Sequence, residues 1–301
     1  MKLFLLCFFS FYFRENMLSS EIENDILSKE DFTVKIRYDC HLHSNFSGDC
    51  DTPAERMIEK AVSLGMEGIC FTEHLDIDAP GDPEFFLLDT DRYFSALLEL
   101  REKWKNKLRV RIGVELGVQR HLLPDLTRYA ASYPFDFIIC SQHYVDGGDP
   151  YDPSYFEDRS ERECYERFFQ VEYESLCHFS SFDTLGHMDY VVRYGPNKNR
   201  NYSYEKYREY LDPILRLLIQ NGKCLEVNTG GLKHGLGEPN PCIGILKRYR
   251  ELGGELITIG SDAHIPDHLA YAFPKAASLL RELGYRYYCV FQDRKPEQLP
   301  L

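Results

Sequence analysis

Two histidines separated by one residue occur in the segment Asp39-Cys40-His41-Leu42-His43. The run before it, residues 34–38, is typical of a β-strand. Alternate side chains on a strand point to the same face, so His41 and His43 would project together, about 7 Å apart along the strand. Two imidazoles in that arrangement can reach one metal ion. The pair alone fits equally well with two unrelated polar residues at a strand end.

Similar residues follow other strand-like runs downstream. A single histidine at a strand end is more often a satisfied polar residue than a ligand. Nine candidates at the same topological position, however, indicate a multinuclear metal site. With Asp49 contributed by the loop after the first strand, the candidate ligands are His41, His43, Asp49, His74, Glu115, His143, His187, Asp262 and His264.

Strand-like runs alternate with amphipathic helical runs from residue 34 to the C-terminus, as in a parallel α/β sheet or barrel. Helices are predicted at 92–105, 123–133, 155–178, 204–220, 243–252 and 268–283, after a first helix that Thr52 would cap and Gly65 would end. A short strand at 287–291 would close the chain. Seven β/α units without a Pro/Gly/Ser-rich linker predict one closed barrel, in which reacting groups collect at the C-terminal ends of the strands.

The composition is that of a globular protein, with 301 residues, 44% hydrophobic and 28% charged. The formal net charge of −13 argues against a general nucleic-acid surface, which should be basic. Ten cysteines without a CxxC pair or regular spacing predict reduced, mostly buried thiols in a cytoplasmic protein.

The first 34 residues are interpreted as an N-terminal extension outside the core, with one domain over residues 35–301. Their apolar stretch, which reaches Phe13, is too short to span a bilayer. No clear small-residue cleavage site of a signal peptide follows it. We therefore expect neither secretion nor a membrane partner.

Mixed imidazole and carboxylate ligands suit Zn²⁺, Mn²⁺ or Fe²⁺. A carboxylate such as Glu115 can bridge two ions, and bridged ions generate hydroxide from a shared water and clamp the oxygens of a phosphoryl group. This chemistry predicts phosphate monoester hydrolysis by a metal-bound hydroxide, with no other catalytic group. Arg193 is the candidate phosphate contact, because a guanidinium can hold two oxygens at once. An ordinary surface arginine is the alternative.

The order of these motifs resembles the polymerase and histidinol phosphatase (PHP) superfamily, from about residue 36 to the C-terminus. The histidinol-phosphate phosphatase branch is the most similar. The segments that carry this resemblance are Asp39-Cys40-His41-Leu42-His43-Ser44, Phe71-Thr72-Glu73-His74, Gly186-His187-Met188-Asp189 with Arg193-Tyr194-Gly195, Leu225-Glu226-Val227-Asn228-Thr229-Gly230 and Ser261-Asp262-Ala263-His264.

The resemblance implies a distorted (βα)7, TIM-like barrel that holds three divalent metal ions. The implied ligands are His41, His43, Glu115 and Asp262 for the first ion, Glu115, His143 and His187 for the second, and Asp49, His74 and His264 for the third. Asp49 stands where many superfamily members have a histidine, a departure that fits the histidinol-phosphatase branch.

The implied reaction is hydrolysis of L-histidinol phosphate, a step of histidine biosynthesis. Two loops, residues 76–91 and 146–158, are rich in acids and aromatics that favour a cation, although solvated acidic loops are the commoner explanation of such a composition. Alternatives are a phosphoesterase for another small phosphate such as a nucleotide, a PHP nuclease module, which the acidic balance disfavours, and a purely structural metal barrel. The oligomeric state is not predicted.

Overall fold

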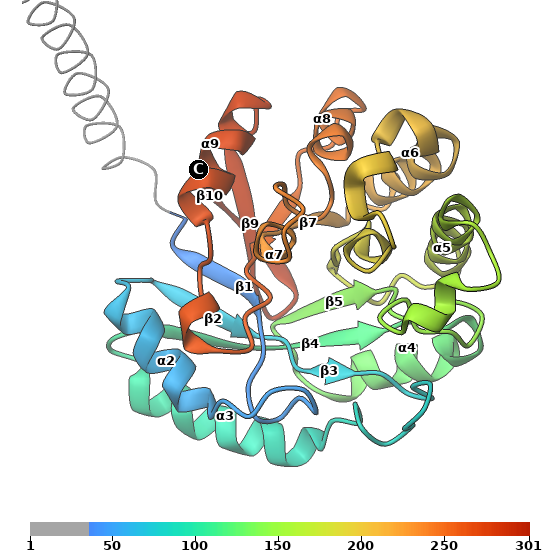
Figure 1. Cartoon of the computed structure of the whole chain (residues 1–301). Coiled ribbons are helices and arrows are strands. Elements are labelled where there is room, and N and C mark those ends of the chain that lie inside the picture. Colours follow the sequence, from blue (N-terminus) through green and yellow to red (C-terminus); the bar gives the residue numbers. More distant parts are fainter. Residues whose placement is uncertain (1–35) are drawn as a thin grey trace, which may run out of the picture. The chain divides into compact units, whose positions relative to one another are not determined.

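Seven parallel strands form the centre of residues 36–301, the part of the chain that this computed structural model describes (Figure 1). Their order in the sheet follows their order in the sequence, as expected for consecutive β/α units. A short eighth strand, β3 (His74–Leu75), pairs with the C-terminal part of β4. The seven strands are β1 (Tyr38–Leu42), β2 (Gly68–Phe71), β4 (Arg109–Gly117), β5 (Phe137–Ser141), β6 (Thr184–Leu185), β7 (Cys224–Asn228) and β8 (Ile257–Gly260).

The last strand returns to the first, so the predicted barrel is confirmed as nearly closed. Just beyond β8, Asp262 N–H donates to the His41 carbonyl at 2.8 Å, and His43 N–H donates to the Ala263 carbonyl at 2.9 Å. The backbones approach so closely that a Cβ at Gly260 would lie 2.3 Å from the Cβ of His41. The C-terminal ends of β1 and β8 therefore lie side by side.

Helices surround the strands on the outside of the barrel (Figure 1). The longer helices turn an apolar stripe inward, as α2 does with Met57, Ile58 and Ala61, so the core lies between the helices and the strands. The helices are α2 (Ala54–Ser63), α3 (Thr90–Trp104), α4 (Leu123–Ser132), α5 (Glu161–Leu176), α6 (Tyr204–Gln220), α7 (Gly230–Lys233), α8 (Ile243–Glu251) and α9 (Phe273–Glu282), with 3₁₀ turns η1 (Arg120–Leu122), η2 (Pro153–Phe156), η3 (Tyr190–Arg193), η4 (Lys198–Asn201) and η5 (Pro266–His268).

The predicted starts of the first helix and of the helix at 155–178 were wrong. Thr52 does not cap α2, because its hydroxyl donates to the His264 carbonyl at 3.0 Å and ties the first loop to the last. The helix predicted at 155–178 begins only at Glu161, where Ser160 and Glu163 form a capping box.

The C-terminal region also differs from the prediction. The helix predicted at 268–283 begins at Phe273, because Ala270 and Ala272 both have positive φ. The short strand predicted at 287–291 is β9 (Tyr287–Gln292), and it pairs with an unpredicted antiparallel strand, β10 (Lys295–Pro300). Most of β10 is exposed, so it carries no apolar alternation that could have marked it.

Among the described residues the cysteines are free, and all are buried except Cys177, as predicted. Within the same residues, the search for a helix long and apolar enough to cross a membrane finds none. The predicted N-terminal extension, residues 1–34, lies outside the described residues.

Candidate metal centre

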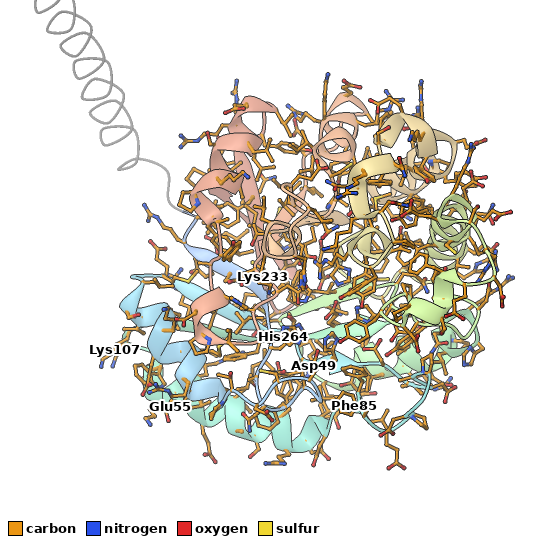
Figure 2. The ribbon with its side chains drawn as sticks, in the orientation of Figure 1. Asp49, Glu55, Phe85, Lys107, Lys233 and His264 are labelled. Carbon is orange, nitrogen blue, oxygen red and sulfur yellow. The ribbon has the colours of Figure 1, made fainter. Side chains whose placement is uncertain are left out.

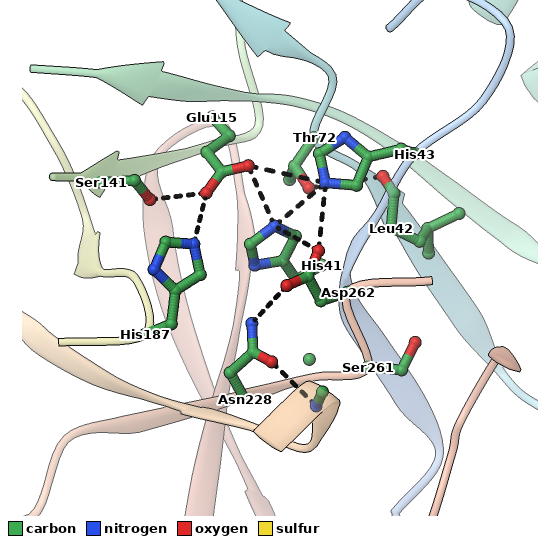
Figure 3. A network of polar contacts seen from close by, with 12 residues as sticks. His41, Leu42, His43, Thr72, Glu115, Ser141, His187, Asn228, Ser261 and Asp262 are labelled. Carbon is green, nitrogen blue, oxygen red and sulfur yellow. Dashed lines mark hydrogen bonds and ion pairs between the residues drawn. The ribbon is translucent and has the colours of Figure 1, made fainter. Parts of the chain in front are cut away.

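The two histidines of the first strand meet at the C-terminal mouth of the barrel. Both side chains are fully buried, and their Nε2 atoms lie 3.2 Å apart. The same nitrogens lie 3.7 Å (His41) and 3.6 Å (His43) from Asp262 Oδ1 (Figure 3). Alternation along β1 and the closure of the barrel by β8 thus bring two imidazoles and a carboxylate together.

Glu115 lies at the centre of the cluster, on β4, and contacts imidazoles from four different parts of the chain. Oε1 lies 2.8 Å from His187 Nε2 and 3.3 Å from His143 Nε2. Oε2 lies 3.2 Å from His41 Nε2 and 3.1 Å from His74 Nδ1. Its two oxygens therefore face two groups of histidines, which is the geometry of a bridging carboxylate (Figure 3).

A third group lies closer to solvent. Asp49 Oδ2 is 3.1 Å from His264 Nε2 and 3.7 Å from His74 Nε2. The His43 ring packs against the rings of both His74 and His264, with centroid distances of 4.3 Å to each. Asp49 and His264 lie beside each other near the middle of the view in Figure 2. The nine side chains singled out in the sequence thus converge on one region.

Arg193 also reaches this region. It is 5% exposed, so the alternative of an ordinary surface arginine was wrong. Its guanidinium donates to Asp262 Oδ2 at 2.9 Å, to Asn228 Oδ1 at 2.8 Å and to Asn240 Oδ1 at 2.7 Å. Three of its five N–H groups are used in these bonds, which hold it beside a candidate ligand.

The electrostatics keep the carboxylates ionised. Burial opposes charge on Glu115, but His41, His74 and His143 outweigh it and hold the pKa of Glu115 well below its usual range. Burial likewise opposes a charged His74, yet Glu115, Asp76 and Asp49 raise its pKa to about 9. For His43, burial and then the neighbouring His74 and His264 lower the pKa to about 3. The anionic oxygens that raise the pKa of a neighbouring imidazole would equally favour a bound cation in this pocket.

Several details fit divalent metal ions. His74 Nδ1 and Asp76 Oδ2 are 3.5 Å apart and buried, yet neither makes a hydrogen bond within the described residues. A bound cation would satisfy such atoms. Nitrogen and oxygen donors of this kind suit Zn²⁺, Mn²⁺ or Fe²⁺. The groups whose donor atoms lie within 4.8 Å of one another are His41, His43 and Asp262; His41, Glu115 and His187; His43, His74 and His264; and His74, Asp76 and His143.

Other side chains orient the candidate ligands, and sequence reasoning missed most of them. Glu226 accepts from the ring of His41, with Oε1 2.6 Å from Nδ1, and the Ser47 hydroxyl lies 3.1 Å from His43 Nδ1. Glu73, which was considered for this role, acts through Ser47, whose hydroxyl donates to it at 2.7 Å. An acid inside the apolar run of β7 was the available signal for Glu226.

The chain is similar to a known protein family and to curated histidinol-phosphatases. The model of the PHP domain family matches residues 39–230. The histidinol-phosphatase of Lactococcus lactis is 31% identical over 260 residues, which cover 86% of this chain and 96% of that protein. A probable histidinol-phosphatase of Clostridium acetobutylicum is also 31% identical, over 80% of this chain and 92% of that protein.

Solved structures show the same fold. The crystal structure of the Lactococcus lactis histidinol phosphate phosphatase in complex with zinc, L-histidinol and phosphate superposes with a TM-score of 0.80, at 30% identity and with 87% of this chain and 98% of that chain covered. A putative histidinol phosphatase from Listeria monocytogenes, at 20% identity, has a TM-score of 0.68, with 79% of this chain and 99% of that chain covered. The chain therefore belongs to the PHP domain family.

Proposed function

We propose that this protein is a metal-dependent phosphatase that hydrolyses L-histidinol phosphate to L-histidinol and phosphate. The observation that carries the proposal is Glu115, whose two oxygens face imidazoles from four segments at the mouth of the barrel. Similarity to a histidinol-phosphatase over most of the chain supports the substrate. The predicted cytoplasmic location, the absence of a nucleic-acid partner and the domain bounds 35–301 stay predictions.

Three ions are proposed. His41, His43, Glu115 and Asp262 would hold the first, Glu115, His143 and His187 the second, and Asp49, His74 and His264 the third. Zinc, manganese or iron fits these donors. When bound, such ions would activate water and draw charge from the phosphoryl oxygens. Two donor groups support parts of this division: His41, His43 and Asp262 for the first ion, and His74 with His264 for the third. His143 instead groups with His74 and Asp76.

The protein's own contribution is to fix and desolvate the phosphate. Arg193 has two N–H groups beyond the three that bind Asp262, Asn228 and Asn240. We place a phosphoryl oxygen on those remaining donors, because a guanidinium held by neighbouring side chains loses little freedom when it binds an anion. Asp262 is the one anionic partner of Arg193 among these three, while Asn228 and Asn240 are neutral acceptors.

The cationic end of the substrate needs a partly buried acid without a cationic partner. Among the acids of the two loops, Asp76 faces His143, Asp78 lies 2.9 Å from His121, and Asp146 binds Arg167. Asp149 is half-buried near His143 and accepts from the Tyr151 N–H at 2.8 Å, it forms no ion pair within the described residues, and burial raises its pKa. The adjacent Tyr190 ring packs 5.0 Å from the ring of His187. Asp149 and Tyr190 are therefore proposed to receive the ammonium and imidazole groups.

Phosphate release from histidinol phosphate, a nucleoside monophosphate and a DNA oligomer, measured side by side on metal-analysed protein, tests the proposal. We expect histidinol phosphate to be hydrolysed with a kcat/KM at least about tenfold above the others, since two cationic contacts of about 1 kcal/mol each separate it from them. Comparable rates on all three would overturn the histidinol assignment. Preference for the oligomer would favour the nuclease alternative.

A further inference from the structure

Asp76 lies directly after β3 and touches the candidate metal centre. Its Oδ1 is 2.6 Å from His143 Nδ1, while Nε2 of the same ring is 3.3 Å from Glu115 Oε1. The side chain of Asp76 is 1% exposed and that of His143 is 7% exposed. The two nitrogens of one buried imidazole thus face two different carboxylates.

The contact with Asp76 decides which nitrogen can bind a metal. A neutral imidazole carries one N–H, and a carboxylate at hydrogen-bond distance keeps that proton on the nitrogen it faces. The other nitrogen then offers its lone pair and is aimed by the same bond. With Asp76 on Nδ1, the nitrogen of His143 left for a metal is Nε2, on the Glu115 side.

The fold leaves a specific space for this carboxylate. A Cβ at Gly117, two residues beyond Glu115 on β4, would lie 1.8 Å from Asp76 Oδ1. Any side chain at position 117 would therefore push the carboxylate away from His143. One strand supplies both the central carboxylate and the gap that lets Asp76 approach.

A second histidine–aspartate pair involves Asp78, on the same loop as Asp76, but it lies outside the metal centre. His121 Nε2 lies 2.9 Å from Asp78 Oδ2, but both side chains are 59% exposed and neither belongs to a donor group of the described residues. An exposed pair of this kind contributes little. It offers a matched control, with the same residue types and the same kind of contact outside the centre.

We propose that Asp76 is a positioning residue, which fixes His143 with Nε2 toward Glu115 and thereby sets the affinity of one metal site. This inference rests on the proposed metal-dependent function. Asp76 acts through His143 and contacts neither phosphate nor water in this role. Its free oxygen, Oδ2, points toward His74 Nδ1 at 3.5 Å, so direct metal binding by Asp76 is the competing role that a test must separate.

The test is zinc binding to the full chain at fixed pH, by dialysis against chelator-buffered zinc and elemental analysis, for wild type, Asp76→Asn, His143→Ala, the double variant and Asp78→Asn. We expect Asp76→Asn to weaken one equivalent of zinc about 10- to 100-fold and Asp78→Asn to leave binding unchanged. The double variant should bind that equivalent no more weakly than His143→Ala, because Asp76 acts only through the lost ring.

Equal zinc affinities of Asp76→Asn and Asp78→Asn would overturn the inference. A further tenfold loss of zinc affinity when Asp76→Asn is added to His143→Ala would also overturn it, since Asp76 would then be a ligand itself. Gly117→Ala keeps the carboxylate and displaces it, so it should reproduce the Asp76→Asn loss while circular dichroism stays native. Zinc affinities that follow this pattern in a protein inactive on histidinol phosphate would overturn the proposed substrate and leave the role of Asp76 standing.

Discussion

Single residues at the mouth of the barrel carry the chemistry because each presents one donor atom at a fixed place. His143 shows this best, since its two ring nitrogens face Asp76 and Glu115. Replacing such a ring removes a donor without removing a core element. Activity and stability should therefore separate at this position.

His143→Ala is expected to lose phosphate release by about 100-fold or more while remaining folded, because one ion loses a ligand and its orientation. Phosphate release together with circular dichroism and elemental analysis checks this. His121→Ala serves as the control, since that ring is exposed and pairs, within residues 36–301, with Asp78 alone. An active, metal-replete His143→Ala would mean that the second ion is assigned to the wrong residues.

Asp149→Asn should raise the KM for histidinol phosphate by about tenfold and leave hydrolysis of p-nitrophenyl phosphate nearly unchanged, because only the first substrate carries an ammonium group. Steady-state kinetics on both substrates measure the difference. Asp152→Asn is the control, since Asp152 is exposed and caps the η2 turn. Equal changes on both substrates would place Asp149 in general support of the site instead of substrate recognition.

What the sequence reveals at this scale is the set of ligands and not their partners. Histidines and acids that follow apolar runs can be recognised from spacing alone, and the structure brings all nine together. The sequence did not connect Asp76 with His143, which is 67 residues away, or Glu226 with His41, which is 185 residues away. Contacts between residues so far apart in the sequence become visible only in the folded barrel.

Elements place these residues, and most follow from periodicity. The bounds of α6 were predicted to the residue. Helix α5 is shorter than predicted, because the capping box of Ser160 and Glu163 sets its first residue. Helix α5 also carries an exception to its own pattern. Glu172 is 1% exposed, and within the described residues neither of its oxygens has a hydrogen-bond partner.

The pH dependence of stability should report on Glu172. Burial, and then Asp189, raises the pKa of Glu172 well above its usual 4.5 in the folded protein. Its contribution is therefore fully present below about pH 4.5 and is lost as pH rises through the folded-state pKa. Glu172→Gln has no carboxyl group to titrate here, so between pH 6 and 9 its free energy of unfolding should fall less than that of wild type.

Urea unfolding of chelator-treated protein across this range measures the effect without changes in metal loading. Glu174→Gln on the same helix is the control, because its carboxylate is 42% exposed and forms surface ion pairs with Arg120 and Arg167 that contribute little. Parallel pH curves for Glu172→Gln and wild type would show that Glu172 has a partner in solution, such as a buried water.

At the scale of the whole molecule, the barrel and the site depend on each other. The alternation of strands and helices predicted the seven units and their order, since strands that are consecutive in the sequence are usually neighbours in a parallel sheet. The seam between β1 and β8 could not be predicted, because it depends on the close approach at Gly260 and on backbone bonds across more than 200 residues. The same seam brings His41 and His43 to Asp262.

Metal removal should therefore weaken the entire fold. Ions shared by the ends of β1 and β8 bind only the folded chain, and an ion present at a hundredfold its Kd adds about 2.7 kcal/mol to stability. We expect the Tm of zinc-loaded protein to fall by about 5 to 10 °C on chelation and to recover when zinc is restored. Calorimetry paired with elemental analysis checks this.

Asp262→Asn removes the ligand on the β8 side, so its Tm should respond less to chelation than that of Asp78→Asn, which keeps every proposed ligand. An unchanged Tm in wild-type protein proven to be metal-free would show that the seam holds without ions, and the proposed first site would then not join the two strands.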